Sequence, residues 1–252
     1  MFLEMQIHSE QLKKITRVNV ILPKEQKGKD PKVLWLLHGH SGDYASWVHQ
    51  TGIERYAEQN YLAVIMPDGA NAWYTDTAYH ANYLTYITEE LPELCFRNFS
   101  RLSREREMNM IGGLSMGGYG ALKAALTYPE KYSACIALSG ALDITRKGRV
   151  CNLDEWRSVF GFDLQSADEL EGTRHDLFAL ARENKEKGLP FPKTYIWCGQ
   201  QDKLIDANRA FSQHLSALGV EHLYEESEGT HNWKYWDLHI CDGLAYVLGG
   251  KE

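Results

Sequence analysis

Cysteines are few in this sequence of 252 residues, and no long apolar run is present. The five cysteines are odd in number and widely spaced, and none forms a C-x-x-C pair: Cys95, Cys135, Cys151, Cys198 and Cys241. This pattern argues against both a disulfide framework and a zinc site. No run approaches the roughly 20 apolar residues that a membrane-spanning helix needs, and Glu4 stands where a signal peptide would carry positive charge. We therefore expect a cytoplasmic protein with no membrane partner, no bound metal and no cofactor.

Positive charge is scarce as well. Lysine and arginine total 27 against 34 aspartate and glutamate residues, which gives a formal net charge of −7. The one lysine-dense stretch, residues 24–32, is diluted by Glu25 and Asp30. Because nucleic-acid binding normally needs a basic patch, a small molecule is the expected partner and nucleic acid is not. A homo-oligomer is left open.

Short apolar runs alternate with segments of helical spacing. Residues 33–37 and 62–66 are continuously apolar, as strands buried on both faces should be. Residues 2–8 and 15–22 alternate loosely around a polar turn, which predicts an antiparallel hairpin at a sheet edge. Further strands are predicted at 108–111, 135–138, 194–198 and 222–226, and helices at 47–60, 79–99, 121–126, 207–218 and 233–248. This alternation predicts a single α/β domain over residues 1–252, with a mainly parallel sheet covered by helices on both faces.

Residues 142–192 interrupt the alternation. They are polar, contain Gly148 among other glycines, and hold a small apolar group that includes Trp156 and Phe162. An insertion of this length between two core strands is usually functional, so we expect a cap or lid. A peripheral helical excursion that only packs on the sheet is the alternative.

The turn after the predicted strand 108–111 reads Gly113-Leu114-Ser115-Met116-Gly117 and leads into a helix. Such a strand–turn–helix lifts the serine hydroxyl above the sheet and aims the backbone N–H of Met116 toward a developing oxyanion. A tightly packed glycine turn or a phosphate cradle is the alternative, but a dinucleotide site would need G-x-G-x-x-G on an early strand. The motif therefore predicts Ser115 as a nucleophile.

A serine nucleophile needs a histidine base. The histidines that follow Ser115 are His175, His214, His222, His231 and His239. His231 lies in a loop just after the predicted last strand, where Gly229 leaves the chain room to swing the imidazole over the sheet edge. The alternative for His231 is a local hydrogen bond to the backbone.

The acid that orients this histidine should also follow a strand. Asp202 comes directly after the predicted strand 194–198, whereas Asp206 is better explained as a first-turn residue of the next helix. Asp143, after the preceding strand, is the competitor. We expect Asp202 to hold His231 in the right tautomer without accepting its proton.

A second oxyanion donor is expected in the loop after the first long parallel strand. Gly39 there permits the backbone to turn the N–H of His40 inward. The sequence His38-Gly39-His40 could suggest a metal site, but no further ligand has suitable spacing.

Several short stretches together resemble a known family. They are Leu-Leu-His-Gly at 36–39, Pro-Asp-Gly at 67–69, Trp-Tyr-Thr-Asp at 73–76, and the segments 113–120, 197–202 and 229–231. These stretches are spread over nearly the whole chain. They resemble the putative-esterase family, which includes esterase D (S-formylglutathione hydrolase). Within this family the likeness is greatest to the bacterial tributyrin esterases. The resemblance implies the α/β-hydrolase fold, Ser115, Asp202 and His231 as a triad, the His40 and Met116 amides as oxyanion hole, and activity on short acyl esters. His40 departs from the family, where an apolar residue is often found.

Trp73 and Tyr74 fall on a predicted loop at the carboxyl side of the sheet, where ligands bind in open α/β sheets. We expect them to wall the substrate pocket. The hypothesis is a serine carboxylesterase that acts on short-chain acyl esters through an acyl-enzyme on Ser115. The alternatives are an S-formylglutathione thioesterase, a carbohydrate acetyl or feruloyl esterase, and a binding protein of the same fold without activity.

Overall fold

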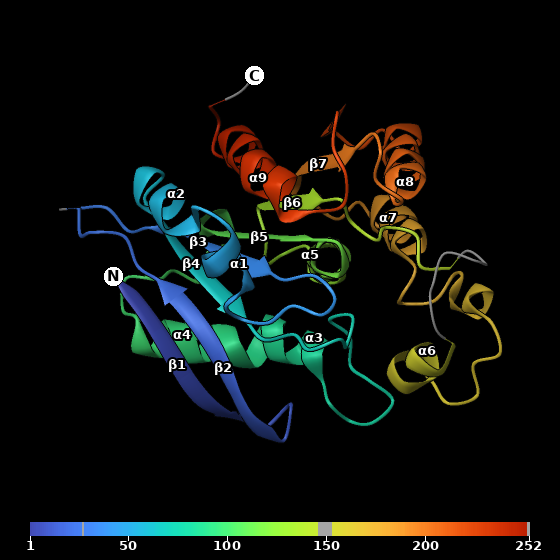
Figure 1. Cartoon of the computed structure of the whole chain (residues 1–252), viewed down its shortest axis with the longest axis horizontal. Coiled ribbons are helices and arrows are strands. Elements are labelled where there is room, and N and C mark those ends of the chain that lie inside the picture. The colour runs from blue at the N-terminus through green and yellow to red at the C-terminus, as the bar shows by residue number, and fades with distance from the viewer. Residues whose placement is uncertain (27, 146–152, 251–252) are drawn as a thin grey trace.

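A computed structural model describes residues 1–26, 28–145 and 153–250. In this part of the chain eight strands form one sheet, in the order β1-β2-β4-β3-β5-β6-β7-β8 (Figure 1). The strands are β1 (Phe2–Ser9), β2 (Lys14–Ile21), β3 (Lys32–Leu37), β4 (Leu62–Pro67), β5 (Asn109–Leu114), β6 (Ala134–Leu138), β7 (Lys193–Gly199) and β8 (His222–Ser227). β1 and β2 pair antiparallel, β2 pairs antiparallel with β4, and the other neighbours are parallel. The predicted edge hairpin and the mainly parallel sheet are therefore confirmed.

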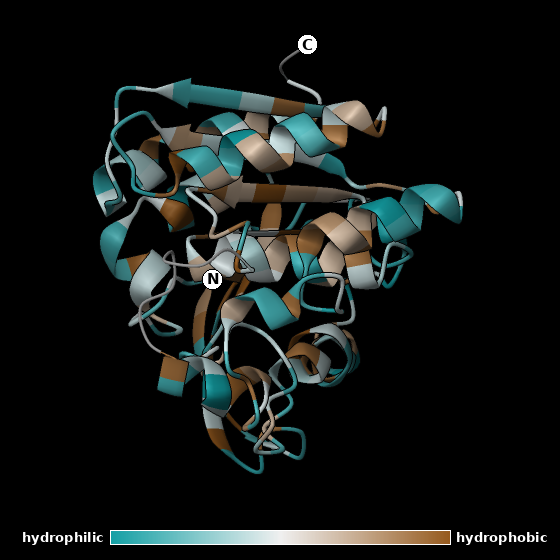
Figure 2. Ribbon diagram, turned by 90° about the vertical axis from the view of Figure 1, so that its right-hand side faces the viewer, coloured by the Kyte–Doolittle hydropathy of each residue, from teal (hydrophilic) through white to brown (hydrophobic). Residues whose placement is uncertain are grey.

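Helices cover both faces of the sheet (Figure 1). The α-helices are α1 (Ser46–Gln50), α2 (Ile53–Gln59), α3 (Tyr83–Thr85), α4 (Leu91–Asn98), α5 (Met116–Thr127), α6 (Leu153–Phe160), α7 (Leu177–Glu186), α8 (Ile205–Ala217) and α9 (Trp233–Val247). Side chains of α1, α2 and α9 pack in one core cluster, and those of α4, α5, α7 and α8 pack in the other. Along β3, Val33, Trp35 and Leu37 enter one cluster while Leu34 and Leu36 enter the other, because successive side chains of a strand point to opposite faces. Apolar residues accordingly gather on the inner strands and hydrophilic ones toward the outside (Figure 2).

Two of the predicted helices are interrupted. The helix expected over 47–60 is divided into α1 and α2 at Thr51, whose backbone is extended and whose hydroxyl accepts the Ile53 N–H at 3.2 Å. The helix expected over 79–99 starts at Tyr83 and contains a π-helical turn, Tyr86–Glu90, just before Pro92. Proline has no N–H to donate, so widening the turn ahead of it lets the helical segment continue without that hydrogen bond.

The described part of the predicted insertion holds α6, the 3-10 helix Ala167–Leu170 and α7. Its apolar side chains, among them Trp156 and Leu170, join the larger core cluster, so the segment is packed onto the domain. Figure 1 shows α6 at the side of the molecule, beyond the edge of the sheet. Gly148 and Cys151 lie outside the described residues. A lid movement of residues 142–192 stays a prediction.

The carboxyl ends of β3, β5, β7 and β8 lie at one edge of the sheet, since these strands are parallel. β4 and β5 flank β3 on opposite sides, so the chain reverses direction across the sheet at β3. In open α/β sheets such a switch point creates a crevice outside the strand ends. Within residues 1–26, 28–145 and 153–250, no helix has both the length and the apolar character needed to cross a membrane.

Candidate active site

Ser115 occupies a sharp turn between β5 and α5. Its φ of +53° and ψ of −118° are strained for a residue with a side chain. The turn depends on its glycines, because a Cβ on Gly113 would lie 2.5 Å from the Gly117 carbonyl and one on Gly117 would lie 2.4 Å from the Leu37 oxygen. The backbone thus holds the Ser115 side chain above the sheet edge, as the nucleophile-elbow interpretation predicts.

His231, in the loop after β8, bridges Ser115 and Asp202. Its Nε2 lies 3.0 Å from the Ser115 Oγ, and its Nδ1 lies 2.8 Å from the Asp202 Oδ2. The carboxylate accepts the Nδ1–H, which leaves Nε2 to accept the hydroxyl proton of Ser115. The side chain of His231 is 23% exposed and that of Asp202 is 0% exposed. The structure therefore brings the three predicted residues together in one hydrogen-bonded chain.

The Asp202 carboxyl stays acidic in spite of its burial. Desolvation by burial raises its pKa, but the hydrogen bond and charge of His231 lower it, as do the Leu204 N–H and the Ser139 hydroxyl. The net result is a pKa below its usual range. An ionised carboxylate at this place fixes the imidazole and stabilises the imidazolium. Asp143, the competing acid, is also buried and accepts hydrogen bonds from Thr145, whereas His231 Nδ1 is hydrogen-bonded to Asp202.

Gln201, next to Asp202, was not singled out by the sequence. Its backbone N–H donates to the Gly229 carbonyl at 2.9 Å, and its Oε1 accepts the Gly229 N–H at 2.9 Å. Gly199 lets the two loops meet, because a Cβ there would lie 2.3 Å from the Gly229 oxygen. Gln201 therefore ties the loop of the acid to the loop of the base. Its position in the stretch 197–202, beside the predicted acid, was the only available signal.

The loop after β3 lies against the nucleophile. The Gly69 N–H donates to His38 Nε2 at 2.8 Å, so His38 donates its Nδ1–H to the Gly39 carbonyl at 2.7 Å. A Cβ on Gly39 would lie 3.4 Å from the Ser115 Cβ, which places His40 next to the elbow. Met116 is the first residue of α5, where an N–H has no partner within the helix. Both predicted oxyanion donors thus belong to segments that meet at Ser115.

A cleft of about 420 Å³ opens at Ser115. Its lining combines glycines and small polar groups with an aromatic wall: Gly39, His40, Ser41, Gly42, Ser46, Gln50, Leu114, Ser115, His231, Asn232, Trp233 and Trp236. The imidazole of His231 meets the ring of Trp236 edge to face at 4.8 Å. The cleft therefore reaches the side chains of Ser115 and His231.

Trp73 and Tyr74 are not among the described residues that line this cleft. Tyr74 is fully buried, and its hydroxyl donates to the His38 carbonyl at 2.9 Å. Trp73 is buried too and donates its Nε1–H to Glu155 Oε1 at 3.0 Å. Both residues have positive φ, +53° and +45°, and both side chains are buried. Their contacts support the loop after β3, and a role for them as walls of the substrate pocket stays a prediction.

A second Ser–His–Asp chain is present at the end of β8. The Ser227 Oγ lies 3.3 Å from His239 Nε2, and His239 Nδ1 lies 2.9 Å from Asp242 Oδ2. Ser227 also accepts the Trp197 indole N–H at 3.1 Å, and the His239 ring stacks on Trp197 at 3.9 Å. Ser227 is not on an elbow between a strand and a helix, so this chain is a packing arrangement.

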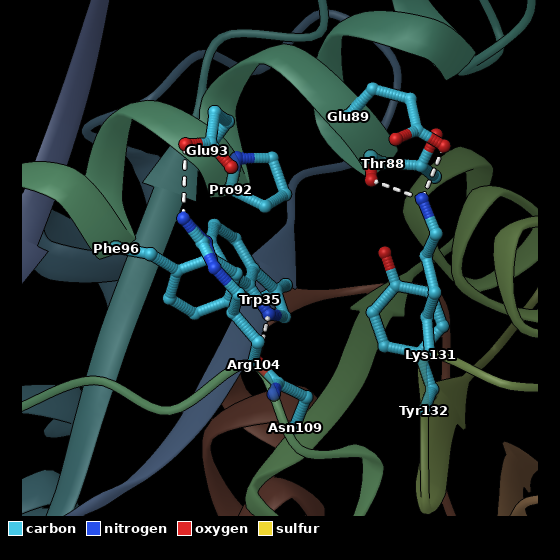
Figure 3. A pocket seen from close by; sticks show the side chains of 10 residues that line it. All are labelled: Trp35, Thr88, Glu89, Pro92, Glu93, Phe96, Arg104, Asn109, Lys131 and Tyr132. Carbon is cyan, nitrogen blue, oxygen red and sulfur yellow. Dashed lines mark hydrogen bonds and ion pairs between the residues drawn. The ribbon is translucent and has the colours of Figure 1, made fainter.

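Another hollow, of about 180 Å³, lies beside α4 (Figure 3). It includes Asn109, the first residue of β5, so it is at the end of that strand opposite Ser115. Its two cations are paired, Lys131 with Glu89 and Arg104 with Glu93 (Figure 3). Among the described residues that line it there is no serine, cysteine or histidine, so these residues offer no pair of nucleophile and imidazole base.

A strained elbow serine, a histidine held by a buried carboxylate and a glycine-containing loop at the carboxyl edge of a parallel sheet define the serine hydrolases of the α/β-hydrolase class. The family model described as "Putative esterase" matches residues 9–247. The chain belongs to this family, which confirms the resemblance seen in the sequence.

Individual relatives agree with this assignment. An acetyl esterase of Caldicellulosiruptor saccharolyticus is 34% identical over 263 residues, which cover 97% of each protein. The structure of FphF, a fluorophosphonate-binding serine hydrolase of Staphylococcus aureus, superposes with a TM-score of 0.91 at 33% identity and 98% coverage of each chain. That of FrmB, an S-formylglutathione hydrolase of the same organism, gives 0.88 at 32% identity and 98% coverage of each chain. The chain is thus a carboxylic ester hydrolase of the serine esterase type, with the α/β-hydrolase fold.

Proposed function

We propose that the chain hydrolyses short-chain acyl esters of small alcohols, with Ser115, His231 and Asp202 as its catalytic triad. The observation that carries this proposal is the chain of two hydrogen bonds, 3.0 and 2.8 Å long, from the elbow serine to the buried carboxylate. The limited cleft of about 420 Å³ supports a small substrate.

In the first step the Ser115 Oγ attacks the ester carbonyl carbon while His231 Nε2 takes the hydroxyl proton. The carbonyl oxygen becomes an oxyanion and accepts hydrogen bonds from the backbone amides of His40 and Met116. Donors of this kind are worth about 10²–10³-fold in kcat each. The tetrahedral intermediate then collapses, the carbon–oxygen bond to the alcohol breaks, and His231 returns its proton to the leaving alkoxide.

In the second step water attacks the acyl-Ser115 ester. His231 removes a proton from the water, and the same two amides hold the second oxyanion. Collapse of that intermediate releases the carboxylic acid and restores the Ser115 hydroxyl. Asp202 stays ionised throughout and stabilises the imidazolium that forms in each half-reaction, in keeping with the lowered pKa of its carboxyl.

The same machinery would cleave a thioester. The names of the relatives mention acetyl esters, S-formylglutathione and, for a structure that is 20% identical, ferulic acid. Relative rates on acetyl esters, S-formylglutathione and feruloyl esters would identify the substrate class. The cytoplasmic location and the cap role of residues 142–192 stay predictions, the latter supported by the contact of α6 with His40.

Turnover of p-nitrophenyl acetate and butyrate by a Ser115→Ala variant tests the proposal. We expect kcat to fall by about 10⁴-fold or more, since removal of a triad nucleophile leaves only the oxyanion hole and binding. Ser227→Ala is the matched control, because it removes another serine that is hydrogen-bonded to a His–Asp pair. It should keep turnover within about 2-fold. Turnover by the Ser115→Ala variant close to that of the natural sequence would refute the proposal.

A further inference from the structure

Glu155 of α6 reaches across from the insertion to the loop beside the nucleophile. Its Oε1 lies 2.9 Å from His40 Nε2 and also accepts the Trp73 indole N–H at 3.0 Å. The side chains of His40 and Glu155 are 36% and 23% exposed, so the pair sits at the rim of the site. The next residue, Trp156, packs on the Trp73 ring at 4.8 Å. Two consecutive residues of α6, Glu155 and Trp156, thus contact the loops that follow β3 and β4.

These loops are built from strained backbone. Ser41, Ala70, Trp73 and Tyr74 all have φ between +45° and +63°. Residues with a Cβ persist in this region only where the surrounding structure determines their conformation. The Ser41 N–H donates to Asn71 Oδ1 at 2.8 Å, which joins the two loops, and Glu155 holds both from outside.

The imidazole of His40 is fixed at both nitrogens. Nε2 faces the Glu155 carboxylate and donates to it, while Nδ1 lies 3.0 Å from the Ser41 hydroxyl, whose proton it accepts. The same residue carries the backbone N–H that we assign to the oxyanion hole. An oxyanion donor acts only when it is held about 2.7–3.1 Å from the position of the developing charge. A misplacement of about 1 Å can cost about 10²-fold in rate.

We propose that Glu155 is a positioning residue for the oxyanion hole, which acts through the side chains of His40 and Trp73. The carboxylate anchors the imidazole and the indole, and the backbone amide of His40 is thereby held toward the oxyanion. The insertion then completes the site by supporting a loop, in addition to any covering role. This inference rests on the proposed esterase function.

Steady-state kinetics of Glu155 variants test the inference. Glu155→Ala should lower kcat by about 10-fold and leave KM within about 2-fold, because the loss falls on the transition state. Glu155→Gln keeps an acceptor oxygen of the same shape and should recover part of the rate, to about 3-fold below the natural sequence, since neutral hydrogen bonds are weaker. Asp154→Ala is the control on the same helix, because Asp154 is 87% exposed and pairs with Arg157 at the surface.

A double-mutant cycle separates positioning from general stability. His40→Leu keeps the backbone amide but removes the imidazole, so adding Glu155→Ala to it should cost no more than about 3-fold further. Affinity for an alkyl boronic acid, whose boron takes up the Ser115 oxygen to form a tetrahedral adduct like the intermediate, should fall in parallel with kcat in Glu155→Ala and be unchanged in Asp154→Ala. If Glu155→Ala does not fold, Glu155→Gln in the two His40 backgrounds gives the same comparison.

The outcomes distinguish the two proposals. If kcat of Glu155→Ala stays within 2-fold, or if KM alone changes, the positioning role is overturned while the loss of activity in Ser115→Ala still supports the esterase function. If the cost of removing Glu155 is as large in the His40→Leu background, its action does not pass through His40 and the inference fails. If Ser115→Ala retains turnover, the esterase proposal itself fails.

Discussion

At the scale of single residues, the site depends on positions where backbone atoms come very close together. Gly113, Gly117 and Gly199 each stand where a Cβ would come within 2.5 Å of backbone atoms of another segment. These contacts set the positions of Ser115 and His231. The reactive side chains are therefore placed by residues that have no side chain.

The acid is tested by exchanging its carboxylate for an amide. Asp202→Asn should lower kcat by about 10⁴-fold, because the amide oxygen is held by the Leu204 N–H and the NH2 group then faces Nδ1, which favours the wrong tautomer of His231. Asp143→Asn, at the competing acid, should keep most of the turnover. Steady-state kinetics on p-nitrophenyl acetate measure both, and a larger loss in Asp143→Asn than in Asp202→Asn would reverse the assignment.

The sequence predicted the candidate triad more readily than the residues that hold the triad and its loops in place. Ser115 and Asp202 each follow a mostly apolar run that can be seen locally, and His231 follows a short strand-like segment beside Gly229, whereas Gln201 and Glu155 were identified only from contacts with distant residues. The positive φ of Tyr74 and its full burial cannot be deduced from residue type. The contact of Glu155 with His40 spans 115 positions and leaves no local pattern.

At the scale of elements, α5 and the insertion meet in a buried polar cluster. Lys123 of α5 donates to Thr75 Oγ1 at 2.5 Å and lies 3.0 Å from His175 Nδ1. Burial, and then the charge of Arg174, hold the pKa of Lys123 well below its ordinary value of 10.5, although Asp76 opposes this. Burial, and then Lys123 and Arg174, lower the pKa of His175 to about 3. The cluster joins α5, the loop after β4 and the insertion through hydrogen bonds.

The Lys123 amine makes stability depend on pH. In the unfolded chain the amine binds a proton below pH 10.5, whereas in the folded protein it stays neutral down to a much lower pH. Because the unfolded state binds more protons, the free energy of unfolding rises with pH between the two pKa values, by at most about 1.4 kcal/mol per pH unit. Denaturant unfolding measured between pH 8 and 9.5 should show this rise. In the Lys123→Met variant the free energy of unfolding should rise less steeply with pH, by up to about 1.4 kcal/mol per pH unit. Equal slopes would contradict the assigned neutrality of Lys123.

Elements of the fold differ in how far local sequence determines them. β3 and β4 are continuous apolar runs whose burial on both faces leaves little choice of structure. The separation of α1 from α2 depends on the Thr51 hydroxyl, which accepts a backbone N–H in place of the helical hydrogen bonds. The π-helical turn before Pro92 likewise follows from one missing donor, and helical periodicity alone cannot locate either feature.

At the scale of the whole molecule, the parallel sheet gathers distant parts of the chain at one edge. Ser115 and His231 are 116 positions apart and come together because β5 and β8 end on the same side. The loop after β3 reaches the same point, since β3 is the neighbour of β5. The order serine, acid, histidine along the chain is the order that this fold imposes.

Covalent labelling of the natural sequence with a fluorophosphonate, followed by peptide mass spectrometry, tests the central claim most directly. An activated serine displaces fluoride from phosphorus, so one phosphonyl group should be found on Ser115. The label should be absent from Ser115→Ala and retained by Ser227→Ala. An unlabelled Ser115, or a label that persists in Ser115→Ala, would contradict the assignment of Ser115 as the nucleophile.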